Sequence, residues 1–541
     1  MKKHLKKILL MTCILTLLTG CNNSDSSVNN NALENTTSSN QENTLTEERT
    51  FENATVIQLS DEMITVDGNP VTNNTENAVY TANDIVFYLD GQDFTYGEGT
   101  EADAHSQAEA NAHTVVHITK PGRYVLSGKL SAGQIAVDLG ENAEDDPAAV
   151  VTLILNGVDI NCSVAPAVIF YNVYECGSND TETATKDIDT TAAGANILLP
   201  DNSHNFVKGS YVARIYESVE LNENGTKVVD SEKLHKYDGA FYSKMSMNIN
   251  GEEENTGDLT ITAENEGLDS ELHLTINGGH IVIYSGNDGI NTNEDGVSVT
   301  TINGGFLTIK VTGATGEGDG IDSNGWLVIN GGHVLAEACS TSADAGIDSD
   351  MGIHINGGDV FATGNMLDRI SESTQNYAVF NFTTQQKAGT SYTLERSTGP
   401  LYTYTPENDF TYLIFSTPNL HEDSYTFWQN DEQLAGAKGE AMGGMTPPDS
   451  FEGGQRPEGM TPPNGFEGGQ RPEGMTPSDD FEIGQHPEGM TPPDGFEISQ
   501  RPSGNKSGFG MMEDVELSTE FMIEDGGNYF SFVSKATETA N

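Results

Sequence analysis

Acidic residues next to glycine recur in the middle of the chain, with oxygen-rich neighbours that suit a bound cation. Each copy reads acidic residue, glycine, aliphatic residue, Asp or Asn, then Ser or Thr. The copies are Glu266-Gly267-Leu268-Asp269-Ser270, Asp288-Gly289-Ile290-Asn291-Thr292, Asp319-Gly320-Ile321-Asp322-Ser323, and Ala345-Gly346-Ile347-Asp348-Ser349 with Asp344 just upstream; Asp238-Gly239-Ala240 is a looser one. Carboxylate, amide and backbone carbonyl oxygens are the ligands that Ca²⁺ prefers, roughly six to eight around one ion.

A second phrase, Ile-Asn-Gly, sets the period of this region. It begins at Ile249, Ile276, Ile302, Ile329 and Ile355, at intervals of 27, 26, 27 and 26 residues. A fixed period of this length is typical of repeat proteins. Apolar residues alternate on both sides of each phrase, which predicts strands with one buried face. Long helices do not fit units so rich in Gly, Asn and Asp.

We therefore predict an all-β fold, a parallel β-helix (solenoid) in which each unit is one coil. The alternative is a β-sandwich in which the turn spacing is coincidental. In a β-helix, residues at equal phase stack about 4.8 Å apart. Stacked carboxylates repel one another unless they are solvated, protonated or bridged by a cation.

This reasoning predicts calcium as a cofactor, bound by the oxygen-bearing residues of the acidic phrases. The predicted ligands are Glu266, Asp269, Asp288, Asn291, Asp319, Asp322, Asp344 and Asp348. The alternative is that Asp-Gly and Asn-Gly form tight turns whose side chains cap the backbone.

The first residues have the features of an export signal. Lysines precede a short apolar run at residues 8–18, too short to span a bilayer as a mature anchor. The run ends in Leu18-Thr19-Gly20-Cys21, which resembles the bacterial lipoprotein signal, whose processing places a diacylglycerol on Cys21. We predict a signal peptide at residues 1–21 and a lipid-anchored protein outside the cytoplasmic membrane. The alternative is an ordinary secretory signal with a chance cysteine.

Composition divides the rest of the chain. Residues 22–50 are polar and predict a disordered stalk, and residues 51–437 form the predicted β-helix domain. Residues 438–505 repeat every 15 residues and are rich in Pro, Gly and Met, which indicates a low-complexity arm. Residues 506–541 form a tail that includes a candidate returning strand. Within the domain, the aromatic residues of 401–428 indicate a cap over the core, or alternatively a sugar-stacking platform.

Charge and cysteine content narrow the choice of partners. The formal net charge of −57 excludes nucleic acid, and an acidic polysaccharide would need divalent cations as a bridge. Beyond the predicted signal peptide, which contains Cys13 and Cys21, the odd set Cys162, Cys176 and Cys339 argues against a disulfide framework, so we expect buried thiols.

Several segments together resemble the carbohydrate-binding domain family of Gram-positive surface proteins, which is similar in fold to pectate-type polysaccharide lyases. The segments are residues 124–128, 133–137, 153–160, Tyr237-Asp238-Gly239-Ala240, the Asp-Gly-Ile-Asp repeats and residues 413–418. The resemblance covers about residues 50–435. It implies a right-handed parallel β-helix, bound calcium, and attachment to plant or wall polysaccharide, with cellulose and acidic sugars as candidate ligands. Ala345 departs from the acidic position of the fourth repeat.

Two functions compete, polysaccharide binding without cleavage and a calcium-dependent lyase. A lyase needs a basic residue that removes the proton next to the uronate carboxyl. Between residues 251 and 370 the basic residues are Lys310 and Arg369, and neither has a basic neighbour in the repeats. We therefore predict no catalytic residue and a non-catalytic binding protein, with the lyase as alternative and a structural adhesin as a further one. His273, His280, His333 and His354 are expected to face outward from strands.

Overall fold

The computed structural model describes residues 51–177, 179–439 and 517–532. Regular structure in these residues is almost entirely β, with one short helix, α1 (Gln107–Asn111). The all-β prediction is therefore confirmed. In the described part of the chain, no helix has the length and hydropathy needed to cross a membrane. The predicted signal peptide with Cys21, the stalk at 22–50, the repeats from 440 to 505 and most of the tail lie outside the described residues.

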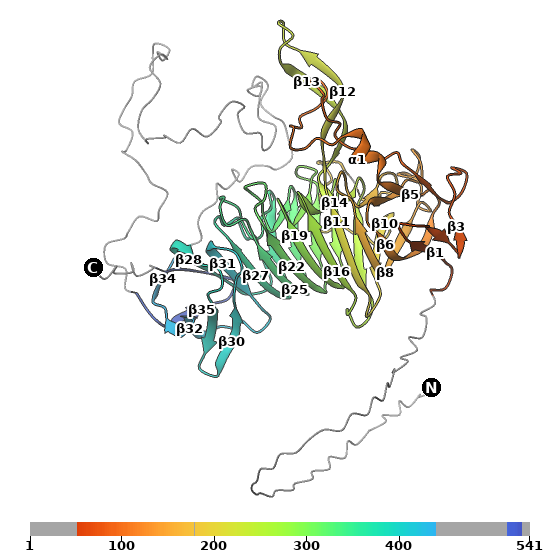
Figure 1. Ribbon diagram of the computed structural model, residues 1–541. Coiled ribbons are helices and arrows are strands. Elements are labelled where there is room, and N and C mark those ends of the chain that lie inside the picture. The colour runs from red at the N-terminus through yellow and green to blue at the C-terminus, as the bar shows by residue number, and fades with distance from the viewer. Residues whose placement is uncertain (1–50, 178, 440–516, 533–541) are drawn as a thin grey trace, which may run out of the picture. The chain divides into compact units, whose positions relative to one another are not determined.

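Three ladders of parallel strands make up the centre of the fold (Figure 1). The first ladder contains β10 (Ala195–Leu199), β15 (Met247–Gly251), β18 (Leu274–Ile276), β21 (Val299–Ile302), β24 (Trp326–Ile329) and β26 (Gly352–Ile355). The second contains β11 (His204–Gly209), β16 (Asp258–Ala263), β19 (His280–Ser285), β22 (Phe306–Val311), β25 (His333–Glu337) and β27 (Asp359–Gly364). The third contains β7 (Gly133–Val137), β9 (Val168–Phe170), β14 (Gly239–Ser243), β17 (Glu266–Ser270), β20 (Ile290–Thr292) and β23 (Ile321–Ser323).

From β14 to β22 the chain visits the three ladders in rotation, so each repeat adds one strand to each ladder. The isoleucines of the Ile-Asn-Gly phrases pair directly from strand to strand, so the stacking predicted from the period is confirmed. In the last four phrases a second glycine follows, and Gly279, Gly305, Gly332 and Gly358 have φ between 83° and 95°. Only glycine adopts this backbone conformation without strain, which explains the repeated Gly-Gly.

Columns of aliphatic side chains fill the space between the ladders. Leu259, Ile281, Leu307, Val334 and Val360 occupy one column of the second ladder, and none is more than 1% exposed. Burying one such side chain stabilises the fold by about 1.5 to 3 kcal/mol. The free cysteines Cys162 and Cys339 are buried, as expected, whereas Cys176 is half-buried.

The N-terminal strands extend the parallel arrangement less regularly. β1 (Ala54–Leu59), β6 (Gly122–Leu130) and β8 (Val151–Asn161) pair in parallel, and β8 continues into both the first and second ladders. A long hairpin, β12 (Val212–Leu221) with β13 (Val228–Tyr237), is inserted before β14 and extends beyond the ladders (Figure 1).

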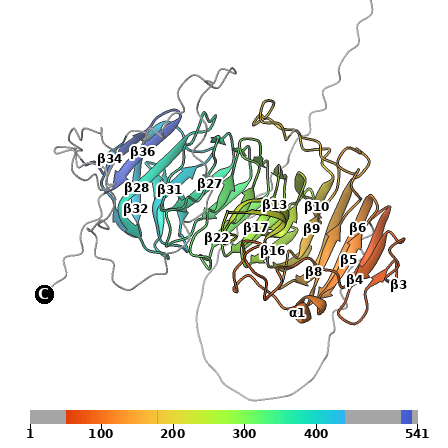
Figure 2. The same ribbon diagram turned by 90° about the horizontal axis from the view of Figure 1, so that it is seen from above.

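The fold changes after β27, within the range predicted as β-helix. β31 (Phe410–Ser416) pairs antiparallel with β27 and with β28 (Tyr377–Gln386), and β36 (Gly527–Phe532) lies parallel to β28 (Figure 2). A second antiparallel sheet contains β29 (Tyr392–Arg396), β30 (Gly399–Tyr404), β32 (Asp423–Gln429), β33 (Glu432–Gln433) and β35 (Phe521–Ile523). Phe380 and Phe427 stack between these sheets with ring centroids 4.1 Å apart. Most aromatic side chains of 401–428 are thus internal, which favours a cap over a sugar platform.

One expectation about the histidines is wrong. His273 is only 2% exposed, although it was expected to face outward. A Cβ on Gly177 would lie 2.7 Å from its Nε2 atom, and Thr190 contacts Thr275 nearby at 2.7 Å, so the segment before β10 covers this part of the first ladder. Periodicity identifies the face of a strand but does not reveal which distant segment covers it.

Candidate metal centre and adjoining pocket

Three buried carboxylates converge at the third ladder. Asp238 lies just before β14, and Glu266 and Asp269 belong to β17. Each offers an oxygen within 4.8 Å of the other two, and the residues are 8%, 4% and 1% exposed. The register of β14 and β17 brings them together, because Gly239 pairs with Glu266 and Tyr242 with Asp269. We call these three residues the carboxylate cluster.

Few hydrogen bonds compensate for this concentration of charge. The Asp238 backbone N–H donates to Asp269 Oδ2 at 3.1 Å, and the Asn293 amide donates to Asp269 Oδ1 at 2.6 Å. Lys236 Nζ lies 2.7 Å from Asp238 Oδ2. Burial, and then the neighbouring carboxylates, hold the pKa values of Glu266 and Asp269 well above their usual range. Ionisation of these acids inside the fold is therefore disfavoured unless a cation compensates their charge.

Two buried oxygens provide a test of whether a cation fits. Among the described residues, neither Glu266 Oε2 nor Asn291 Oδ1 has a hydrogen-bond partner. Asn291 also donates from Nδ2 to Glu266 Oε1 at 3.2 Å, so its carboxamide lies against the cluster. Leaving buried acceptors unsatisfied costs free energy. Carboxylate and amide oxygens in this setting fit a hard cation such as Ca²⁺.

A row of oxygen-bearing side chains begins at Asp269 and continues through the later repeats. Asp269, Asn291 and Asp322 pair in register, and the bridge between Ile321 and Ile347 brings Asp348 to the next position. Burial, with nearby aspartates as a second cause, raises the pKa of Asp322 to about 6 and that of Asp348 to about 7.

In the last three phrases, the acid that opens or precedes the phrase also accepts a hydrogen bond from a backbone N–H group of a neighbouring repeat. Asp288 Oδ1 accepts from the Asp319 N–H at 2.6 Å, and Asp319 Oδ1 accepts from the Ala345 N–H at 2.5 Å. Burial raises the pKa of Asp288 well above its usual range and that of Asp319 to about 10. Asp344 accepts from the Gly318 N–H at 2.6 Å. These contacts match the turn-capping role that the sequence left open.

The predicted ligands therefore divide into two groups. Glu266 and Asp269 meet in the carboxylate cluster with Asn291 beside them, while Asp288, Asp319, Asp322, Asp344 and Asp348 form the continuing row. In the described chain, the cluster is the one place where three acidic, His or Cys side chains converge this closely. The predicted set omitted Asp238, because its phrase matches the repeat loosely and lies one residue out of phase with Glu266.

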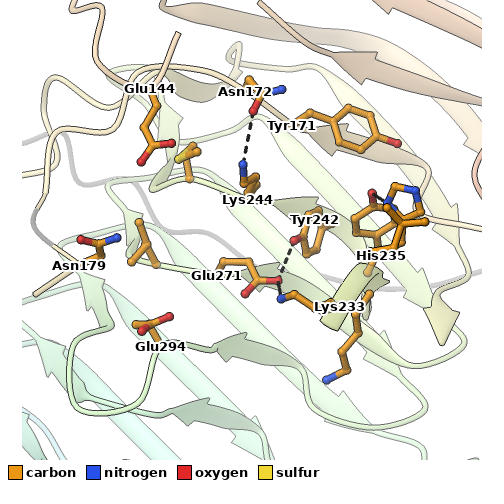
Figure 3. Close-up of a pocket in the computed structure, with 15 residues that line it drawn as sticks. Glu144, Tyr171, Asn172, Asn179, Lys233, His235, Tyr242, Lys244, Glu271 and Glu294 are labelled. Carbon is orange, nitrogen blue, oxygen red and sulfur yellow. Dashed lines mark hydrogen bonds and ion pairs between the residues drawn. The ribbon is translucent and has the colours of Figure 1, made fainter. Parts of the chain in front are cut away.

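A pocket of about 470 Å³ is shown in Figure 3, and one of its lining residues, Lys236, is the ion-pair partner of Asp238 in the cluster. The C-terminal residues of β13, at the base of the hairpin, form one wall. The residues that follow β14 and β17 form another. Lys233, Lys236 and Lys244 all line it, a notable concentration in a chain with a net charge of −57. From the sequence, Ser243-Lys244 is part of the family resemblance, but none of the three lysines was assigned a site role, because they lie outside the acidic repeats.

Hydrogen bonds and ion pairs hold the polar groups of the pocket. Glu271 Oε1 lies 3.0 Å from Lys233 Nζ and accepts from the Tyr242 hydroxyl at 2.7 Å (Figure 3). Lys244 Nζ donates to Asn172 Oδ1 at 3.4 Å. Asp238 is the main cause of a raised pKa at Lys236, which stays protonated. The pocket therefore offers ammonium, phenol and carboxylate groups to a polar ligand.

Comparison with known proteins identifies the family. The profile of the carbohydrate-binding domain-containing protein family matches residues 112–388. The chain belongs to this family. The matched range includes the carboxylate cluster, all three lysines of the pocket and most of the three ladders, whereas most of the aromatic cap follows it.

Individual relatives are more distant. A carbohydrate-binding domain-containing protein of Acetivibrio thermocellus is 29% identical over 170 residues, which are 31% of this chain and 44% of the relative. The chain thus spans less than half the length of that relative. A solved structure described as a polysaccharide lyase-like protein from C. thermocellum, a gadolinium derivative, is 20% identical, with a TM-score of 0.31. The match covers 59% of this chain and 97% of that one.

Proposed function

We propose that this member of the carbohydrate-binding domain family is a calcium-loaded, right-handed parallel β-helix that binds polysaccharide at the cell surface without cleaving it. Membership of the family supports a polysaccharide partner. The rotation of the chain through three parallel ladders supports the coil architecture. The observation that carries the proposal is the buried carboxylate cluster, with unsatisfied oxygens, beside a pocket lined by lysines.

In this proposal, Asp238, Glu266, Asp269 and the Asn291 carboxamide hold the ion. When bound, Ca²⁺ supplies the positive charge that allows these acids to ionise inside the fold. The acids of the later coils, Asp288, Asp319, Asp322, Asp344 and Asp348, are proposed as weaker cation ligands. An acidic sugar, repelled by the net charge of the chain, would then depend on the bound cation and on Lys244. Lys233 and Lys236 already pair with carboxylates, and the pocket also contains three glutamates.

The ion pairs support a non-catalytic role. A lysine acts as a general base only in its neutral form. Lys236 is held protonated by Asp238, and Lys233 is paired with Glu271. Lys310, the basic residue considered from the sequence, lies on the second ladder and pairs with Glu407 at 2.6 Å. None of these three is prepared to remove a proton.

The second candidate function is a calcium-dependent lyase, and Lys244 is the residue that favours it. Lys244 lines the pocket, and its recorded contact is with the neutral amide of Asn172. Among the described residues, and unlike Lys233 and Lys236, it forms no ion pair that a substrate would have to break. If the chain cleaves a uronate polymer, we expect Lys244→Ala to abolish cleavage and retain binding.

The proposed surface location depends on Cys21, which lies outside the described residues. Export and lipid attachment at Cys21 would tether the domain beyond the membrane, with residues 22–50 as a spacer. Incorporation of labelled fatty acid into the wild type and its loss in Cys21→Ser tests this part. An unlabelled wild-type protein would contradict lipid anchoring.

Sedimentation with insoluble polysaccharide tests the proposed function. The protein should comprise residues 22–541, because β36 (Gly527–Phe532) pairs with β28 and a fragment ending near 437 would lose it. It is mixed with cellulose or a polygalacturonate gel, in Ca²⁺ or in chelator, and the supernatant is assayed for unsaturated uronates. We expect retention without products, with the polygalacturonate arm dependent on Ca²⁺. Products that accumulate with time would establish the lyase, and no retention on either polymer would refute the proposal.

A further inference from the structure

The outer face of the second ladder carries a row of aromatic and hydrogen-bonding side chains. The row consists of the first residue of each strand, and these residues pair directly in the ladder register: His204, Asp258, His280, Phe306, His333 and Asp359. We call it the outer row. Its six positions span five strand spacings, or roughly 24 Å across the strands.

The rings in the middle of the outer row are contiguous. The centroids of His280 and Phe306 lie 6.0 Å apart, as do those of Phe306 and His333. Tyr402 of β30 continues the strip, with its ring 6.2 Å from that of His333. Phe306 is 51% exposed although the adjacent Leu307 fills the core, so packing does not require an aromatic residue at this position. The exposed part of the strip is Phe306 with the side chains of His280 (47% exposed) and His333 (22% exposed), an aromatic surface that a ligand can contact.

Hydrogen-bonding groups extend the strip at one end. Asp258 lies between two histidines, with its carboxylate oxygens 2.6 Å from His204 Nδ1 and 2.8 Å from His280 Nδ1. His333 Nδ1 lies 3.7 Å from Asp359 at the other end. These groups can accept hydrogen bonds from, or donate them to, sugar hydroxyls, while the rings contact the apolar face of a pyranose.

The charges of the outer row favour a neutral ligand. Two of its six residues are aspartates and none is Lys or Arg. Its three histidines each lie beside an aspartate, and a uronate chain would find no Lys or Arg partner in the row, in contrast to the pocket with its three lysines. The row and the carboxylate cluster belong to different ladders, so the two surfaces can differ in specificity.

We propose that the outer row is a binding site for a neutral, linear polysaccharide such as a β-glucan, whose chain lies across the strands. This inference rests on the proposed function, since it assumes that the partner is a polysaccharide. It separates two specificities: neutral glycan contacts the second ladder, and acidic glycan contacts the pocket and the metal centre.

Isothermal titration calorimetry of residues 22–541 with cellohexaose tests the inference. Phe306→Ala should weaken binding about tenfold, the loss expected for one aromatic stacking contact. Phe206→Ala is the matched control, because Phe206 lies on the outer face of the same ladder, is 54% exposed and is outside the row. We expect it to bind like the wild type. Both substitutions replace exposed side chains, and melting curves check that both variants fold.

The outcomes separate this inference from the proposed function. Wild-type affinity in Phe306→Ala, or equal losses in both variants, would overturn the outer row as the site. Retention on polygalacturonate without any affinity for cellohexaose would overturn the inference and leave the proposed function standing. A wild-type protein that binds neither polymer would refute both.

Discussion

Two ladders of side chains with the same period differ in whether neighbouring side chains satisfy one another's hydrogen-bonding groups. The asparagines of the Ile-Asn-Gly phrases stack along one edge of the first ladder, and each Nδ2 donates to the Oδ1 of the preceding asparagine at 2.9 to 3.0 Å. This asparagine ladder comprises Asn250, Asn277, Asn303, Asn330 and Asn356. The acidic row of the third ladder, apart from Asn291, consists of carboxylates, and its buried members have raised pKa values.

The difference follows from the two functional groups. An amide carries a donor and an acceptor, so identical amides stack as partners. An ionised carboxylate carries acceptors alone, so identical carboxylates need protons or a cation between them. Repetition therefore yields a structural element on one side of the coil and, in our account, a cation-binding element on the other.

Removal of calcium should produce the largest effect. Because a cation that binds the folded state stabilises it by mass action, chelator should lower the stability of the wild type by about 4 kcal/mol relative to Ca²⁺ at a thousand times its Kd. Thermal melts in Ca²⁺ and in chelator measure this difference. Identical melts would show that the acidic row needs no cation.

The metal-free protein should also lose stability as pH rises. In the folded state the pKa of Asp322 is about 6 and that of Asp348 about 7, both above the usual value near 4. The folded state therefore holds protons that the unfolded chain has released, and this stabilisation is present below pH 4 and lost as pH rises through 6 to 7. From these two carboxyls we expect, in chelator, about 4 kcal/mol less stability at pH 8 than at pH 5, measured by urea unfolding, with a shallower slope in Asp348→Asn. A metal-free protein that is more stable at pH 8 would contradict this.

Replacement of one cluster acid should uncouple stability from calcium. Glu266→Gln replaces a carboxyl whose ionisation is opposed by burial with an amide that never ionises, so in chelator the variant should be about 2 kcal/mol more stable than the wild type. It should gain less from added Ca²⁺, because it lacks one ligand. Glu422→Gln, at an exposed position, is the control and should behave like the wild type in both buffers. An undiminished response to Ca²⁺ in Glu266→Gln would exclude Glu266 as a ligand.

The smallest expected effect comes from placing a carboxylate in the asparagine ladder. Asn303→Asp removes the donor that contacts Asn277 Oδ1 and leaves two acceptors facing each other. We expect a loss of about 1 kcal/mol at pH 7, recovered in part when the new carboxyl is protonated. Added Ca²⁺ should not restore it, because a single carboxylate has no partners there. Restoration by Ca²⁺ would mean that the two ladders differ less than proposed.

The sequence predicts the contacts between repeated strands, but it does not predict the contacts made by segments outside the repeats. The spacing of Ile249, Ile276 and Ile302 predicts the stacking correctly, because coils of equal length bring equal phases together. The pocket could not be predicted, because a hairpin outside the period delivers Lys233 and Lys236. The cap was predicted only in part: the sequence indicated a candidate returning strand in residues 506–541, but not that β36 pairs with β28 inside the cap.

Bound calcium, measured directly, tests the central claim. Residues 22–541 are equilibrated with Ca²⁺, passed through a gel-filtration column in metal-free buffer and analysed by plasma emission spectrometry, with Glu266→Gln beside the wild type. The account predicts that the wild type retains calcium and that the variant retains at least one ion fewer per chain. A calcium-free wild type, or equal calcium in the two proteins, would contradict the carboxylate cluster as a metal centre.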